Sequence, residues 1–238
     1  MMYRWEPDMI RYMQDASEHS RYHQILVDEM LPWLNRKTHI CDAGCGLGYL
    51  SLALAEHVSH VTAVDINGDA LRVLREKNAE NVTVRHGDIA KLIPPHPYDA
   101  MVFCFFGGIE EILRIAKAQC RKTVFVISRN YTSHRFSVGN YPAGDYGFSR
   151  AKAVLSEKGI SFTGKELQLE FGQPFRSLED AHRFFELYSR DGDKDLITDE
   201  FLKEKLMEQG GEFPWYLPHL RKIGFLCFDA GAIPEEVL

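Results

Sequence analysis

Residues 39–50 read HICDAGCGLGYL, where a short apolar run meets a glycine-rich turn and then the start of a helical pattern. The turn has glycine at every second position, at Gly44, Gly46 and Gly48. This spacing suits a loop whose backbone takes unusual dihedral angles and lets a ligand approach without intervening Cβ atoms. The helix that follows is expected to direct its N-terminal amides, which carry partial positive charge, at the ligand. The stretch therefore predicts a ligand site between a strand and a helix.

The position of the glycines separates two classes of cofactor. A dinucleotide-binding fingerprint, Gly-x-Gly-x-x-Gly, would need glycine where this chain has Tyr49. An acid followed by closely spaced glycines instead resembles the first motif of the class I S-adenosylmethionine-dependent methyltransferases. The resemblance implies that this segment wraps the amino-acid end of the cofactor. The residues assigned to it are Asp42, Ala43, Gly44, Cys45, Gly46 and Gly48.

Composition limits the class of protein. A length of 238 residues with 45% hydrophobic content is ample for one large domain, or for one domain with an elaboration. The net charge of −6 disfavours general binding to nucleic acid or to anionic membranes. No apolar stretch is long enough to span a membrane, and the N-terminus lacks the apolar core of a signal peptide. We therefore expect a cytoplasmic protein with no membrane partner, whose oligomeric state the sequence leaves open.

The five cysteines give no sign of a metal site. They are an odd number scattered through apolar segments, which indicates reduced core residues. Cys41 and Cys45 have neither a second pair nor a nearby histidine to complete a ligand set, so no metal is expected.

Strand-like and helix-like patterns alternate along the chain. After the glycine turn, apolar and β-branched runs occur at 60–65, 82–86, 98–106 and 122–127, with helical periodicity between most of them. This order predicts a parallel sheet with right-handed crossovers and helices on both faces. With an extended segment at 160–171 and a last strand at 222–229, we expect a Rossmann-like α/β fold of seven mostly parallel strands. The family resemblance implies that the seventh strand pairs antiparallel.

Two of these strands end next to an acid. Asp65 closes the run at 60–65, where doubly wound folds place an acid that accepts the ribose hydroxyls; the alternative is a cap on the helix expected at 69–78. Asp88 follows the next strand, and the resemblance implies that it holds the adenine amino group while the Ile89 N–H meets a ring nitrogen. The alternative for Asp88 is a turn residue that binds its own backbone. The cofactor residues assigned outside the glycine turn are Asp65, Ile66, Gly87, Asp88, Ile89 and Phe105.

The acceptor side is expected beyond residue 130. Residues 130–148 are polar and aromatic, without clear periodicity, and leave the edge where open α/β sheets bind ligands. His134 is the candidate catalytic residue, as a general base, and its alternative is a solvated surface histidine. The candidates for pocket walls or anion contacts are Tyr131, Arg135, Tyr141 and Tyr146.

An insertion is expected near the C-terminus. Residues 1–174 together with 219–238 would form the cofactor-binding domain, and residues 175–218 a helical cap over the substrate edge. Ser177 with Asp180 has the pattern of a capping box and predicts the start of the first cap helix. Residues 191–195 are expected to form a solvated turn, and Thr198 to cap a second helix running to Gln209.

The sequence predicts an S-adenosylmethionine-dependent methyltransferase that acts on a small molecule by in-line displacement, with S-adenosylhomocysteine as product. Methyltransferases that act on amino groups of nucleobases often carry Asn/Asp-Pro-Pro-Tyr/Phe after the fourth strand, whereas residues 104–107 here read CFFG. This difference disfavours an amino group of a nucleobase as the methyl acceptor. The alternatives are an RNA or protein methyltransferase, whose basic rim only Arg129, Arg135 and Arg150 could seed, and a non-catalytic methyltransferase-like binding partner. A nicotinamide-dependent dehydrogenase is a more distant possibility.

Overall fold

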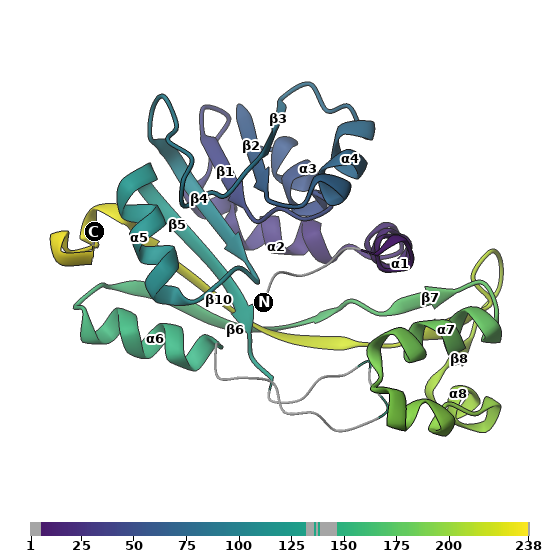
Figure 1. Cartoon of the computed structure of the whole chain (residues 1–238). Helices are drawn as coiled ribbons and strands as arrows, with labels where there is room; N and C mark the ends of the chain where they lie inside the picture. The colour runs from purple at the N-terminus through teal and green to yellow at the C-terminus, as the bar shows by residue number, and fades with distance from the viewer. Residues whose placement is uncertain (1–5, 132–135, 137, 139–146, 238) are drawn as a thin grey trace.

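A twisted sheet runs through the centre of the molecule, with helices on both faces and a smaller unit at one end (Figure 1). The structure is a computed structural model that describes residues 6–131, 136, 138 and 147–237. The helices are α1 (Pro7–Glu18), α2 (Tyr22–Met30), α3 (Tyr49–Ala55), α4 (Gly68–Glu76), α5 (Ile109–Gln119), α6 (Phe148–Glu157), α7 (Leu178–Tyr188) and α8 (Asp199–Lys205). The strands are β1 (His39–Ala43), β2 (His60–Asp65), β3 (Val82–His86), β4 (Tyr98–Cys104), β5 (Cys120–Arg129), β6 (Phe162–Glu170), β7 (Gln173–Phe175), β8 (Met207–Glu208), β9 (Trp215–Leu217) and β10 (Leu220–Asp229).

The large sheet has seven strands in the order β3-β2-β1-β4-β5-β10-β6. The pairings from β3 across to β5 are parallel, whereas β10 runs antiparallel to both of its neighbours. The predicted Rossmann-like fold of seven mostly parallel strands is confirmed, including the antiparallel last strand. Because β10 runs the opposite way, it begins at the edge where the parallel strands end, so its first residues join the candidate site.

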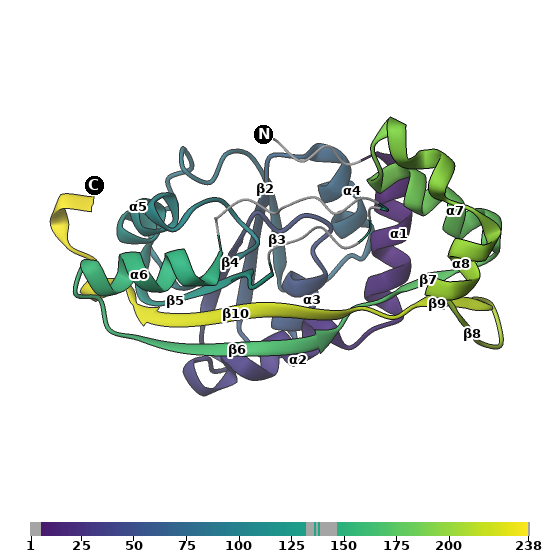
Figure 2. The same ribbon diagram turned by 90° about the horizontal axis from the view of Figure 1, so that it is seen from below.

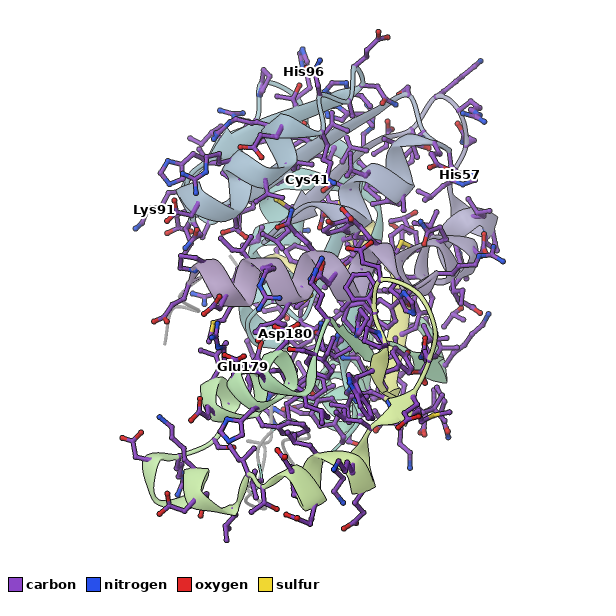
Figure 3. All side chains as sticks on the ribbon, turned by 90° about the vertical axis from the view of Figure 1, so that its right-hand side faces the viewer. Cys41, His57, Lys91, His96, Glu179 and Asp180 are labelled. Atoms are coloured by element: carbon purple, nitrogen blue, oxygen red, sulfur yellow. The ribbon has the colours of Figure 1, made fainter. Side chains whose placement is uncertain are left out.

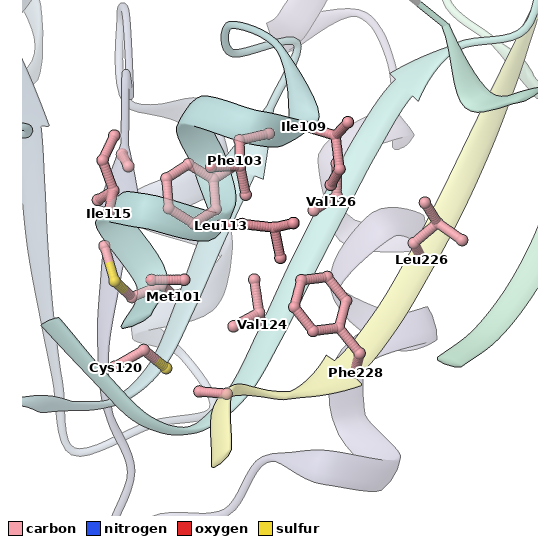
Figure 4. Packing of buried hydrophobic residues seen from close by; sticks show 14 of the residues in the cluster. Met101, Phe103, Ile109, Leu113, Ile115, Cys120, Val124, Val126, Leu226 and Phe228 are labelled. Carbon is pink, nitrogen blue, oxygen red and sulfur yellow. The ribbon is translucent and has the colours of Figure 1, made fainter. Parts of the chain in front are cut away.

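Each strand supplies side chains to both faces of the sheet, because successive residues of a strand point to opposite sides. On one face, residues such as Phe103, Val126 and Leu226 pack against Leu113 of α5 (Figure 4). On the other face, a second core includes residues of α2 and α3. Burial on both faces explains why the central strands have nearly continuous apolar sequences.

The unit at the end of the sheet contains more than helices. A three-stranded sheet, in the order β7-β9-β8, lies with α7 and α8 (Figure 1). The helix predicted to run from Thr198 to Gln209 ends at Lys205, because Leu206 takes an extended conformation and Met207–Glu208 pairs with β9. Residues predicted as a solvated turn lie in a 3₁₀-helix, Asp191–Leu196. Ser177 begins α7 as predicted, since its hydroxyl accepts the Asp180 N–H at 3.0 Å.

Helix α1 lies between the large sheet and the smaller unit (Figures 2 and 3). Tyr12 is 1% exposed, and its ring packs edge-on against Phe184. Its hydroxyl donates to the Asp180 carbonyl at 2.8 Å, and Arg11 pairs with the Asp180 carboxylate at 2.7 Å. Tyr12 is therefore a core residue of the junction between α1 and α7.

Among the described helices, none combines the length and the apolar character needed to cross a lipid bilayer.

Removal of the Tyr12 ring is expected to loosen this junction. Tyr12→Ala should lower the free energy of unfolding by about 3 to 5 kcal/mol because it leaves a cavity, and Tyr12→Phe by about 1 kcal/mol because it removes one hydrogen bond. Denaturant titration measures both. The control is Tyr49→Phe, which loses a more exposed hydrogen bond to Glu18. If Tyr12→Ala were no more destabilising than this control, α1 would not anchor the smaller unit.

Candidate functional site

The glycine turn folds over the end of β2. The Gly44 and Cys45 amides both donate to the Val64 carbonyl, at 2.8 and 3.0 Å. Gly44, Gly46 and Gly48 have positive φ angles of 73°, 54° and 78°, which favour glycine. A Cβ at Gly44 would lie 2.6 Å from the Phe106 ring, and one at Gly48 would lie 2.4 Å from Leu74. At these two positions the missing Cβ makes room for protein side chains, and not for a ligand as the sequence pattern predicted.

Asp65 is bound directly to the glycine turn. One carboxylate oxygen accepts the Gly46 N–H at 2.8 Å, and the other accepts the Asn67 N–H at 2.8 Å. The alternative role, as a cap on the next helix, belongs to Asn67, whose side chain accepts the Asp69 and Ala70 amides. Asp65 is therefore a carboxylate of the turn itself, with lone pairs left for further donors.

The exit of β3 adjoins Asp65, because the Gly87 N–H donates to the Asp65 carbonyl at 3.0 Å. The Asp88 carboxylate accepts the Ala90 N–H at 3.0 Å and pairs with Lys91 at 3.1 Å, and these contacts lower its pKa. The bond from the Ala90 N–H is the contact expected if Asp88 is a turn residue, which was the alternative to adenine binding. Ile89 is a buried core residue.

Two apolar side chains assigned to the cofactor remain accessible to solvent. Ile66, directly after Asp65, is 47% exposed, and Phe105, at the end of β4, is 36% exposed. Phe105 also has a positive φ of 54°, a strained conformation for a residue with a Cβ. Exposed apolar groups on both sides of a polar turn are consistent with contact to a partly apolar ligand.

Asp42 lies beneath the glycine turn, and one of its oxygens finds no donor in the described ranges. It is 1% exposed, and one carboxylate oxygen accepts the Ser51 hydroxyl at 2.6 Å. The other oxygen, Oδ1, has no hydrogen-bond partner among the described residues. Burial raises the pKa of Asp42 to about 7; the bond from Ser51 opposes the shift and the charge of Asp65 adds to it. A buried acceptor without a donor is expensive unless a ligand supplies one.

An arginine surrounded by aromatic rings lies at the same edge, and it was not predicted from the sequence. The Arg221 guanidinium, from the start of β10, lies 4.1 Å from the centroid of the Phe105 ring. It also faces Phe171 at 5.5 Å and Tyr22 at 5.7 Å. The last strand was expected to begin one residue later, so Arg221 was not placed in it. The sequence did offer one indication, because an arginine directly before a strand that starts at the ligand edge is a candidate ligand contact.

His23 on α2 lies against one of these rings. Its ring stacks on Tyr49 at 5.8 Å and meets the Phe171 ring edge-on at 5.7 Å. Burial, with a further contribution from the Arg221 charge, lowers the pKa of His23 to about 3. The imidazole is therefore neutral near pH 7 and is a weak proton acceptor.

The acceptor-side residues expected from sequence fall mostly outside the described residues. His134, Arg135, Tyr141 and Tyr146 all lie there, whereas Tyr131 lies beside Arg221. Arg150, from the possible basic rim, pairs with Glu110. The cysteines are free thiols, and within the described ranges no three potential metal ligands gather.

The site can be compared with known proteins. A family model described as a methyltransferase domain matches residues 40–126. Over 54 residues, 22% of this chain, it is 46% identical to the ribosomal RNA small subunit methyltransferase A of Syntrophus aciditrophicus (strain SB). Over 95 residues, 36% of this chain, it is 30% identical to the tRNA1(Val) (adenine(37)-N6)-methyltransferase of Vibrio vulnificus (strain YJ016). The matched segments span only 19% and 39% of those two proteins.

Solved structures share the fold over most of the chain. The YcgJ protein from Bacillus subtilis superposes with a TM-score of 0.57 at 14% identity, covering 87% of this chain and 98% of that one. Precorrin 8w decarboxylase from Methanobacterium thermoautotrophicum gives 0.51 at 18% identity, covering 86% and 88%. The chain therefore has the fold of these proteins, and the part of it at residues 40–126 matches a methyltransferase domain.

The buried Asp42 should leave a signature in the pH dependence of stability. In the unfolded chain Asp42 ionises above its ordinary pKa of about 3.9, but in the ligand-free fold it keeps its proton up to about pH 7. Between these two pH values the folded state binds more protons than the unfolded state. The free energy of unfolding therefore falls by up to about 1.4 kcal/mol for each unit by which the pH rises. Denaturant titration from pH 4 to 8 should show that Asp42→Asn removes this component.

The control for this measurement is Asp69→Asn, which replaces a surface carboxylate on α4. It should leave the slope of stability against pH close to that of the parent protein. Equal slopes for the parent and for Asp42→Asn would mean that Asp42 does not hold its proton in the folded state.

Proposed function

We propose that this protein is an S-adenosylmethionine-dependent methyltransferase that acts on a small-molecule acceptor and releases S-adenosylhomocysteine. The observation that carries the proposal is the junction of the glycine turn with Asp65, whose carboxylate bonds to Gly46 and whose carbonyl bonds to Gly87. This junction brings together the segments assigned to the amino-acid, ribose and adenine parts of the cofactor.

The residues present fit such a cofactor. The unsatisfied Asp42 oxygen and the turn at residues 42–48 would hold the amino-acid end, and the free lone pairs of Asp65 would accept the ribose hydroxyls. The exposed side chain of Ile66 would line the adenine, with Asp88 and the Ile89 amide at its edge. When bound, the cofactor supplies a methyl group already activated on a sulfonium.

The protein's own contribution is then mainly positional. Transfer of a methyl group by in-line displacement requires the acceptor atom to be held in line and kept apart from water, and orientation can supply much of the rate. Phe105 and the segment after β4 stand where they could form this wall. If the acceptor must lose a proton, His134 remains the proposed base.

The domain arrangement is also a proposal. Residues 1–174 with 219–238 would bind the cofactor, and residues 175–218 would cover the acceptor. Helix α1 bonds to α7, so the N-terminal helix contacts the proposed cap.

RNA methylation is the second candidate function. It is favoured by the partial identities to a ribosomal RNA and a transfer RNA methyltransferase. The net charge of −6 and the CFFG sequence after β4 favour a small acceptor instead. Titration with a short RNA hairpin at low and moderate salt separates the two, because RNA binding should weaken steeply as salt rises.

Loss of the Asp65 carboxylate should weaken cofactor binding. In isothermal titration calorimetry with S-adenosylhomocysteine, Asp65→Ala should lose on the order of 2 to 3 kcal/mol, because charge-assisted hydrogen bonds are removed. Asp65→Asn should lose less, since it keeps one oxygen for the Gly46 amide.

The matched control is Asp69→Ala, on the exposed side of α4, which should bind S-adenosylhomocysteine as the parent does. Circular dichroism checks that each variant is folded. Full affinity in a folded Asp65→Ala variant would remove Asp65 from the cofactor site, and no binding by the parent protein would overturn the proposed function.

A further inference from the structure

We propose that Arg221 binds a carboxylate of a ligand at the edge of the sheet where methyl transfer is proposed to occur. The inference rests on the proposed function and names a chemical group that the site recognises. Its basis is an aromatic enclosure around a cation that has no carboxylate partner in the described part of the chain.

The first observation is where the Arg221 side chain lies. It comes from the second residue of β10, and its guanidinium faces the rings of Phe105, Phe171 and Tyr22 at 4.1, 5.5 and 5.7 Å. These rings come from the end of β4, the segment after β6 and the start of α2. The cation is thus enclosed by segments that converge at the ligand edge.

The second observation is that no described residue supplies an opposite charge to this cation. Several other arginines pair with a carboxylate: Arg11 with Asp180, Arg121 with Asp99, Arg150 with Glu110, Arg176 with Asp15 and Arg183 with Glu179. No carboxylate among the described residues forms an ion pair with Arg221, although its side chain is partly buried. Buried charges are normally paired, because removing them from water is costly.

The aromatic rings meet only part of this cost. Cation–π contacts stabilise the charge from the faces of the guanidinium, but its five N–H donors point outward in the plane. Tyr131 lies beside the group, and the hydroxyl of Tyr22 is buried without a hydrogen bond among the described residues. A planar carboxylate would accept two parallel N–H bonds from such a fork and would neutralise the charge.

The third observation is that the cation lies near the amino-acid end of the proposed cofactor site. Cys104, at the end of β4, is close enough to both Asp42 and Arg221 for each charge to affect its thiol. A ligand carboxylate at Arg221 therefore has two possible sources. One is the carboxylate at the amino-acid end of the cofactor, and the other is an acidic acceptor lying against Phe105.

Two nucleosides distinguish the first source. S-adenosylhomocysteine carries the amino-acid carboxylate, whereas 5′-methylthioadenosine has the same nucleoside and sulfur without it. If Arg221 binds the cofactor, calorimetry should show that Arg221→Met weakens S-adenosylhomocysteine at least tenfold and leaves 5′-methylthioadenosine within twofold of the parent. Arg221→Lys, which keeps the charge but not the fork, should recover part of the loss.

Benzoate, a planar carboxylate, is the probe for the second source. If Arg221 binds the acceptor, S-adenosylhomocysteine should bind Arg221→Met and the parent equally. Benzoate titrated into the parent protein loaded with S-adenosylhomocysteine should then bind, and its affinity should fall at least tenfold in Arg221→Met. The matched control is Lys222→Met, which removes the neighbouring, exposed cation of the same strand and should change neither titration.

The proposal is overturned if Arg221→Met binds both S-adenosylhomocysteine and benzoate with the affinity of the parent. The same conclusion follows if S-adenosylhomocysteine binds both proteins equally and benzoate binds neither protein. It is also overturned if Arg221→Met loses affinity for S-adenosylhomocysteine and for 5′-methylthioadenosine by the same factor, since an equal loss indicates damage to the structure of the site. If S-adenosylhomocysteine fails to bind the parent, the proposed function fails instead. Benzoate titrated into the unliganded parent and Arg221→Met then decides the role of Arg221 separately.

Discussion

The hydrogen bond from the Gly46 amide to the Asp65 carboxylate is the constraint on which the candidate site depends. Two further amides of the turn, from Gly44 and Cys45, bond to the Val64 carbonyl one residue earlier, so the whole turn is fixed to the end of β2. Because Gly87 bonds to the carbonyl of the same aspartate, the exit of β3 takes its position from it as well. One residue thus sets the relative placement of three segments that are far apart in the sequence.

Much of the large sheet could be predicted from sequence, and the reason is physical. Parallel strands covered on both faces need apolar side chains on both sides, so they appear as short, nearly continuous apolar runs. The strands β2 and β3 have the bounds that their sequences predict. The small sheet could not be predicted in this way, since Met207–Glu208 and Trp215–Leu217 are too short to show a period. The packing of Tyr12 against α7 depends on contacts between distant residues, which no local pattern reports.

The two sides of the candidate site differ in the same respect. The residues proposed for the cofactor side come from local motifs, a glycine turn after β1 and an acid at the end of β2, and Asp65 does lie at the turn. The proposed acceptor side is assembled from distant segments. His23 and Arg221 are almost the full chain apart, and each is unremarkable in its own sequence context. Their common position appears only when β10 inserts beside β5, which brings the start of the strand to the ligand edge.

Asp180 holds together parts of the molecule that the chain connects only distantly. Its carboxylate accepts Arg11 and the Arg176 amide, and its carbonyl accepts Tyr12. These contacts join α1 firmly to the start of α7. A displacement of α7 would have to carry the N-terminal helix along or break these bonds. Glu170 adds a further link, because Ser20 bonds to its carbonyl and Tyr216 to its carboxylate. The first helix therefore acts as a structural part of the smaller unit, although the chain places it before the large sheet.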